Sequence, residues 1–206
     1  MKLITQSISP RRFTANELKE IIRPFLFQRD NNGVIGSEVM YGSSRKVADM
    51  VFISKGRSYA IEIKSAYDST IRLEEQIKEY QTLFDYILVF TAPNHLNRIK
   101  AKTPDYIGLY SINESGIEKI RHERINRHVK KSEMLISIPS AVVKNAFSVK
   151  GKLSSDEIRA QALRKSKREI HNYFIDYFKH RLVPDSPVKI DKKPEPAELA
   201  QDYVIV

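Results

Sequence analysis

The sequence has 206 residues, no cysteine, 41% hydrophobic residues and a formal net charge of +10. The lack of cysteine excludes disulfides, zinc fingers built on thiolates and thiol nucleophiles, and the hydrophobic fraction excludes a wholly disordered chain. No apolar run approaches the roughly 18–20 residues that span a bilayer, and the opening "MKLITQSISPRR" lacks the apolar core of a signal peptide. We therefore expect a cytoplasmic protein with no membrane association.

The basic residues are concentrated in one part of the chain. Residues 119–182 contain sixteen Lys/Arg and six Asp/Glu, a net charge of +10, whereas residues 1–118 are net +2 and residues 183–206 are net −2. A local excess of this size is typical of a surface that binds a polyanion, most simply nucleic acid. We expect backbone contacts from the run "RKSKR", through Arg164, Lys165, Lys167 and Arg168.

The first predicted helix begins in the run "TANELKEII". Thr14 and Glu17 have the spacing of a capping box, and Leu18 and Ile22 belong to an apolar stripe at helical spacing. Pro24 is expected to end or kink this helix, because proline has no amide hydrogen to donate.

Three β-type runs follow at 37–41, 46–53 and 59–64, separated by short turns that favour antiparallel pairing. A helix is predicted over 68–84, with Asp68 or Ser69 as its cap. The apolar run 85–91 comes after that helix, so it can pair parallel to 59–64 through a crossover connection.

The second half of the chain is predicted to be mainly helical. The run 106–112 is expected to be an edge strand, with "GIEKIRHE" as its possible partner. Ser154 and Glu157 form a second capping-box pattern, which opens a helical stretch to about residue 182, continuous or with a break.

These elements predict an α/β fold with a mixed central sheet, an antiparallel meander plus a parallel crossover strand, flanked by helices. We divide the chain into a core at 1–132, a basic helical extension at 133–182 and a Pro-rich tail at 183–206. The tail ends in the apolar "DYVIV", which has the composition of a strand that could add to the sheet edge of a partner protein.

Two acidic residues are expected to lie side by side on the sheet. If Lys55-Gly56 is the turn, or if the loop covers 54–57, paired residue numbers sum to 111, and Asp49 lies opposite Glu62. Two carboxylates on strands built for burial repel each other and are costly to desolvate. A divalent cation such as Mg²⁺ (or Mn²⁺) between them removes that cost. Lys64 lies on the same face as Glu62, where an ammonium can orient an attacking water and stabilise charge on phosphorus.

The pattern Asp49, Glu62-x-Lys64, split over a hairpin and followed by a helix, resembles the PD-(D/E)XK superfamily of restriction-endonuclease-like nucleases. Ala48 stands where that motif usually has proline. "QIKEY" is similar to the QxxxY motif of the exonuclease-type members, in which the glutamine lies near the metal and the helix meets DNA. The wider run also resembles a poorly characterised bacterial family with a helical C-terminal part.

The resemblance implies a restriction-endonuclease-like fold and Mg²⁺-dependent hydrolysis of phosphodiester bonds. It implies metal ligation by Asp49 and Glu62, with the carbonyl of Ile63 and with Glu38 as an additional acid. Gln76 would steady the site, and nucleic acid would be contacted by Tyr80 and by Arg45, which opens the run "RKVAD".

We therefore expect a metal-dependent deoxyribonuclease of bacterial or phage origin, acting in repair, mobile-element biology or phage defence. Two alternatives stay open: a nucleic-acid-binding module without catalysis, and a nuclease-fold subunit that acts only within a complex. The sequence contains no GxSxG, Walker A or GxGxxG pattern, which leaves hydrolase-elbow, NTPase and dinucleotide-binding functions without support.

Overall fold

The computed structural model describes residues 11–42 and 45–182. The tail, including the segment expected to add a strand to a partner protein, lies outside this range. A six-stranded sheet has the order β1-β2-β3-β4-β5-β6. Strands β1, β2 and β3 pair antiparallel, β3, β4 and β5 pair parallel, and β6 is antiparallel to β5. The strands are β1 (Val34–Tyr41), β2 (Lys46–Ser54), β3 (Arg57–Lys64), β4 (Tyr86–Thr91), β5 (Gly108–Asn113) and β6 (Gly116–Arg121).

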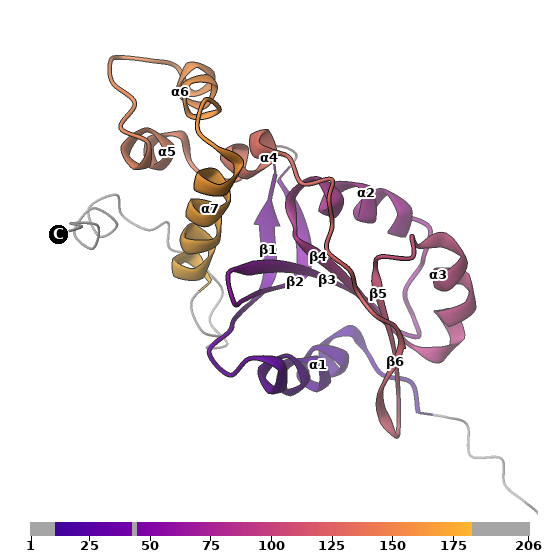
Figure 1. Cartoon of the computed structure of the whole chain (residues 1–206). Coiled ribbons are helices and arrows are strands. Elements are labelled where there is room, and N and C mark those ends of the chain that lie inside the picture. The colour runs from indigo at the N-terminus through magenta and orange to yellow at the C-terminus, as the bar shows by residue number, and fades with distance from the viewer. Residues whose placement is uncertain (1–10, 43–44, 183–206) are drawn as a thin grey trace, which may run out of the picture.

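Helices cover both faces of this sheet (Figure 1). Helix α1 packs on one face, and α2 with the C-terminal helices packs on the other. The α/β class with a mixed sheet flanked by helices is thus confirmed. The helices are α1 (Ala15–Arg29), α2 (Leu73–Leu83), α3 (Leu96–Lys102), α4 (Lys131–Ile136), α5 (Ser140–Ala146), α6 (Ser155–Ala162) and α7 (Lys167–Arg181), with a short 3₁₀ turn, η1 (Pro93–His95).

Each face of the sheet has its own hydrophobic core. On the α1 side, Leu18, Ile22 and Leu26 pack against strand residues such as Phe52 and Phe90. On the other side, one continuous cluster joins the sheet and α2 to the helices between residues 131 and 182, through large side chains that include Phe174 and Phe178. The basic helical extension is therefore packed onto the sheet rather than tethered beside it.

The β2–β3 turn has the predicted register. Lys55 and Gly56 are a two-residue loop with φ angles of 49° and 69°, which is the left-handed geometry of a hairpin turn that matches strand twist. Pairing runs from Ser54–Arg57 to Met50–Ile61, so paired numbers sum to 111 as expected.

Two helix boundaries differ from expectation. Helix α1 has its Thr14–Glu17 capping box and, of the two outcomes expected at Pro24, does not end there but continues to Arg29. The buried Ile22 and Leu26 on either side of Pro24 offset the missing hydrogen bond, whose loss costs about 3 kcal/mol in a helix interior. Helix α2 begins only at Leu73, without a side-chain cap.

The predicted edge strand, 106–112, is instead interior, because β5 lies between β4 and β6 and its side chains are buried. The C-terminal helical stretch does break. Helix α6 begins at the predicted Ser154–Glu157 capping box, and α7 begins at a further capping box, formed by Ser166 and Glu169. "RKSKR" therefore occupies the turn between two helices and the first turn of α7, not the interior of one long helix.

Side chains along β1 and β2 alternate between the two faces of the sheet, but this alternation is interrupted once, at a pair of positions that lie opposite each other. Ile35 and Phe52 face α1, whereas Val39 and its partner Ala48 face α2, although an unbroken alternation would put all four on one side. Residues 38 and 49 lie at this shift, and Glu38 has a φ of 52°, in the left-handed region that is rare for glutamate. The shift places Asp49 where the β2–β3 ladder has ended.

Candidate active site

Lys64, the last residue of β3, is the centre of the candidate site. Its ammonium donates to Glu62 Oε1 at 2.7 Å and to Gln76 Oε1, on the first turns of α2, at 3.0 Å. Lys64 and Glu62 lie two residues apart on one strand and face the same side, as predicted. The lysine side chain is 10% exposed and that of Glu62 is 1% exposed, so this ion pair is shielded from water on most sides.

The second oxygen of Glu62 is held by Tyr80. The Tyr80 hydroxyl donates to Glu62 Oε2 at 2.6 Å, and the ring is fully buried against Tyr41 and Phe84. The QxxxY spacing thus brings Gln76 and Tyr80 to the same ion pair from one helix face. Tyr80 has no exposed surface to offer a nucleic acid, so the expected contact between Tyr80 and DNA does not fit this structure.

Asp49 reaches the site through the main chain of β3. The regular ladder stops at Met50–Ile61, and the Asp49 carboxylate takes the place of a strand carbonyl by accepting a hydrogen bond from the Ile63 amide at 2.7 Å. The backbone ladder therefore ends one residue pair before the predicted pairing of Asp49 with Glu62. The hydrogen bond from the Ile63 amide to the Asp49 side chain continues the contact between the strands.

The two carboxylates still interact electrostatically. Burial and the negative charge of Glu62 raise the pKa of Asp49 to about 6, although the Ile63 amide and the charges of Lys64 and Lys19 lower it. The expected repulsion between the two acids is therefore one cause, after burial, of the raised pKa of Asp49.

Glu38 is paired with a lysine rather than with the other two acids. Its carboxylate is 62% exposed and forms an ion pair with Lys19 of α1. Within residues 11–42 and 45–182, no three His, Asp or Glu side chains gather closely enough to hold a metal ion together. In this arrangement Glu38, whose backbone is left-handed, joins no cluster of three acids among the described residues, and its role as an additional metal ligand stays a prediction.

The other expected ligands supply oxygen atoms, which a hard divalent cation prefers. Asp49 and Glu62 offer carboxylate oxygens, and Ile63, whose amide donates to Asp49, offers its carbonyl oxygen. The raised pKa of Asp49 is the relevant observation, because a cation would relieve the repulsion that raises it.

Lys19 is a site residue that sequence reasoning missed. It lies on α1, its side chain is only 12% exposed, and its charge lowers the pKa of Asp49. Its position in the sequence, thirty residues before Asp49, gives no signal of this proximity.

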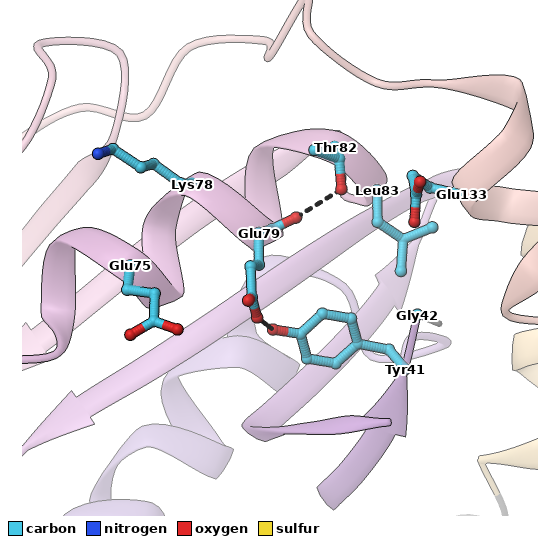
Figure 2. Close-up of a pocket in the computed structure, with 8 residues that line it drawn as sticks. All are labelled: Tyr41, Gly42, Glu75, Lys78, Glu79, Thr82, Leu83 and Glu133. Atoms are coloured by element: carbon cyan, nitrogen blue, oxygen red, sulfur yellow. Dashed lines mark hydrogen bonds between the residues drawn. The ribbon is translucent and has the colours of Figure 1, made fainter. Parts of the chain in front are cut away.

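A pocket of about 320 Å³ lies between the end of β1, α2 and α4, and none of the residues that line it belongs to the Lys64 site. Figure 2 shows Tyr41 pointing toward Glu79 across it, with Glu75 on the same helix and Glu133 opposite. Three carboxylates line this space, and Lys46 pairs with two of them, Glu75 and Glu79. Lys78 also lines the pocket, so two ammonium groups partly offset the three carboxylates.

The predicted nucleic-acid contacts other than Tyr80 are on the surface. Arg45 is exposed just before β2. The four basic residues of the α6–α7 turn are also exposed, and Lys131 fixes that turn by donating to the carbonyls of Leu163 and Lys165 at 2.7 and 2.9 Å.

The fold and site define an α/β protein that has a buried carboxylate–lysine site at the ends of β2 and β3. The chain belongs to the family described as bacteriophage P4 protein cII, whose model matches residues 12–197. Among solved structures, the chain is similar to the SPO1766 protein of unknown function from Silicibacter pomeroyi, with 17% identity and a TM-score of 0.40. That match covers 66% of this chain and 83% of the other.

No match was found among the curated proteins. In the described part of the chain, no helix is both long enough and apolar enough to cross a membrane.

Proposed function

We propose that this protein is a metal-dependent nuclease with a restriction-endonuclease-like core, which hydrolyses phosphodiester bonds in DNA. The observation that carries the proposal is the ammonium of Lys64, held at 2.7 Å from Glu62 and 3.0 Å from Gln76, next to an Asp49 whose pKa is raised to about 6. A structural ion pair needs no second carboxylate beside it, and folding energetics alone favour removal of that second carboxylate.

In this proposal Asp49, Glu62 and the Ile63 carbonyl would hold Mg²⁺ or Mn²⁺, which supplies Lewis-acid charge to the phosphodiester. Lys64 orients the attacking water and stabilises the negative charge that develops on the phosphoryl oxygens. Gln76 and Tyr80 position Lys64 and Glu62, because each holds one polar atom of the pair. Burial of the pair strengthens these interactions relative to water.

The basic α6–α7 turn and Arg45 would bind the phosphate backbone, since both are exposed and cationic. Membership of a phage protein family is compatible with a role in mobile-element biology. The test is incubation of the purified protein with plasmid, linear duplex and single-stranded DNA in Mg²⁺, Mn²⁺ or EDTA. Cleavage that requires the divalent cation supports the proposal. DNA binding without cleavage by an uncontaminated preparation favours a binding module, or a subunit that needs a partner protein.

A further inference from the structure

The loop between β3 and α2, residues 65–72, exposes two large apolar side chains. Tyr67 is 65% exposed and Ile71 is 73% exposed, whereas the other exposed large hydrophobic residues described reach at most 44%. Single apolar residues on a surface are ordinary, but two within five residues of one loop indicate a contact surface.

This loop is anchored by hydrogen bonds within it and from Asn94. Asp68 Oδ2 accepts from the Ser65 amide at 2.7 Å, and the Asp68 amide donates to the Ser65 carbonyl at 3.2 Å. Asn94, beyond β4, donates to the Ala66 carbonyl at 3.2 Å, and the Thr70 side chain is buried. Tyr67 and Ile71 are thus kept outside between anchored neighbours, so little ordering is required when they meet a ligand.

The loop also lies at the candidate active site. It begins directly after Lys64 and leads into the first turns of α2, where Gln76 is 3.0 Å from the Lys64 ammonium. The loop therefore joins two elements that each carry a site residue, and Tyr67 follows Lys64 by three residues. Arg72, at the end of the loop, adds an exposed cation.

An exposed tyrosine, an exposed isoleucine and an arginine together suit one kind of ligand. An aromatic ring stacks on a base, an aliphatic side chain enters between base steps, and a guanidinium binds phosphate. Inside a duplex a base face opens only if neighbouring base pairs unstack, which is costly, whereas unpaired bases present their faces to Tyr67 without that cost. On the basis of the proposed function, we propose that the β3–α2 loop stacks on unpaired bases next to the scissile phosphate, and that the substrate is DNA with a single-stranded segment.

The test is equilibrium binding in an Asp49→Asn background, which removes one negative charge at the site and, under the proposed function, prevents turnover. Fluorescein-labelled probes are a blunt duplex of two annealed strands, the same duplex with a ten-nucleotide single-stranded overhang, and the single strand alone. We expect the two probes with unpaired bases to bind at least tenfold more tightly than the blunt duplex. Adding Tyr67→Ala should weaken their binding roughly 5- to 150-fold, the effect of losing one stacked base, and should leave the blunt duplex unchanged.

Tyr67→Phe serves as the conservative variant, because it keeps the ring and should keep the preference. Phe27→Ala and Ile125→Ala serve as matched controls, since both residues are exposed hydrophobics outside this loop. Equal binding of all three probes, no binding of any, or an equal effect of Tyr67→Ala and the controls would overturn the proposal.

A cleavage assay on the parent protein with the same probes separates this result from the proposed function. A preference for unpaired bases without cleavage in Mg²⁺ refutes the nuclease alone. Cleavage without any Tyr67-dependent preference refutes the base contact alone.

Discussion

The hydroxyl of Tyr80 donates to Glu62 Oε2 at 2.6 Å in the interior of the protein. A hydrogen bond to a buried carboxylate contributes roughly 1.5–3 kcal/mol, and its loss leaves Glu62 less well solvated. Tyr80→Phe should therefore lower the free energy of unfolding by about 1–3 kcal/mol in urea titrations.

The matched control for this change is Tyr41→Phe. Tyr41 is also buried and packs against Tyr80, but its hydroxyl is 3.5 Å from Glu79, too long for a strong hydrogen bond. Its removal should cost clearly less. Equal losses of unfolding free energy in the two variants would mean that the Tyr80–Glu62 hydrogen bond does not stabilise the protein more than the weak Tyr41 contact does.

The raised pKa of Asp49 predicts a pH-dependent gain in stability for Asp49→Asn. The folded-state pKa is about 6, against a usual value of 3.8, so the folded protein favours the protonated acid. The parent protein therefore loses stability as the pH rises from about 4 to 7, by an amount on the order of 2–3 kcal/mol. Asparagine retains an acceptor for the Ile63 amide without the charge.

Without divalent cations, Asp49→Asn should be more stable than the parent at pH 7.5 and similar to it at pH 4, in urea titrations at both pH values. A variant that is less stable than the parent at pH 7.5 would identify Asp49 as half of a favourable structural pair instead.

Asp85 links the helical extension to the sheet. Its carboxylate lies 2.8 Å from His171 Nε2 of α7 and accepts from the amide and hydroxyl of Ser58 at 2.9 and 3.1 Å. Burial alone would raise the pKa of Asp85, but the bonds from His171 and Ser58 lower it below its usual value. A lowered pKa stabilises the folded state above pH 4, and this contribution is lost as the pH falls further.

Asp85→Asn should therefore destabilise the protein at pH 7 by roughly 2–4 kcal/mol, since it breaks a buried network. The difference from the parent should shrink at pH 3. Hydrogen exchange should report faster opening of α7 in the variant, and unchanged exchange there would disprove the link.

The basic α6–α7 turn predicts strongly salt-dependent DNA binding. Changing Arg164, Lys165, Lys167 and Arg168 together to glutamine should weaken binding and reduce the slope of log K against log salt by roughly 2–4, if each contacts one phosphate. A control that changes Arg98 and Lys100, which are exposed on α3, should leave the slope nearly unchanged. An unaltered slope in the quadruple variant would mean that DNA binds to another surface of the protein.

Local signals predicted much of the fold. The capping boxes at Thr14 and Ser154 fix the starts of α1 and α6, and the Lys55-Gly56 turn fixes the register of β2 and β3. These features depend on residues close in sequence, whose geometry has few alternatives. The same register, with the period of two in β3, was enough to bring Glu62, Lys64 and Asp49 into one region.

The rest depends on contacts between distant segments. Nothing near Glu38 indicates a left-handed backbone there, because glutamate is not a residue that favours it, and the ion pair with Lys19 forms only when α1 packs. Pro24 stayed helical because tertiary burial outweighs propensity.

The central claim, that the Lys64 site catalyses phosphodiester hydrolysis, is tested most directly by cleavage of labelled DNA at saturating enzyme and Mg²⁺. The parent protein should cleave in Mg²⁺ and not in EDTA. Lys64→Ala and Asp49→Asn should each lower the single-turnover rate by about 100-fold or more, while Lys78→Ala, on the exposed side of α2, should not. Cleavage by Lys64→Ala and Asp49→Asn at the parent rate, with contaminating nuclease excluded, would contradict the claim.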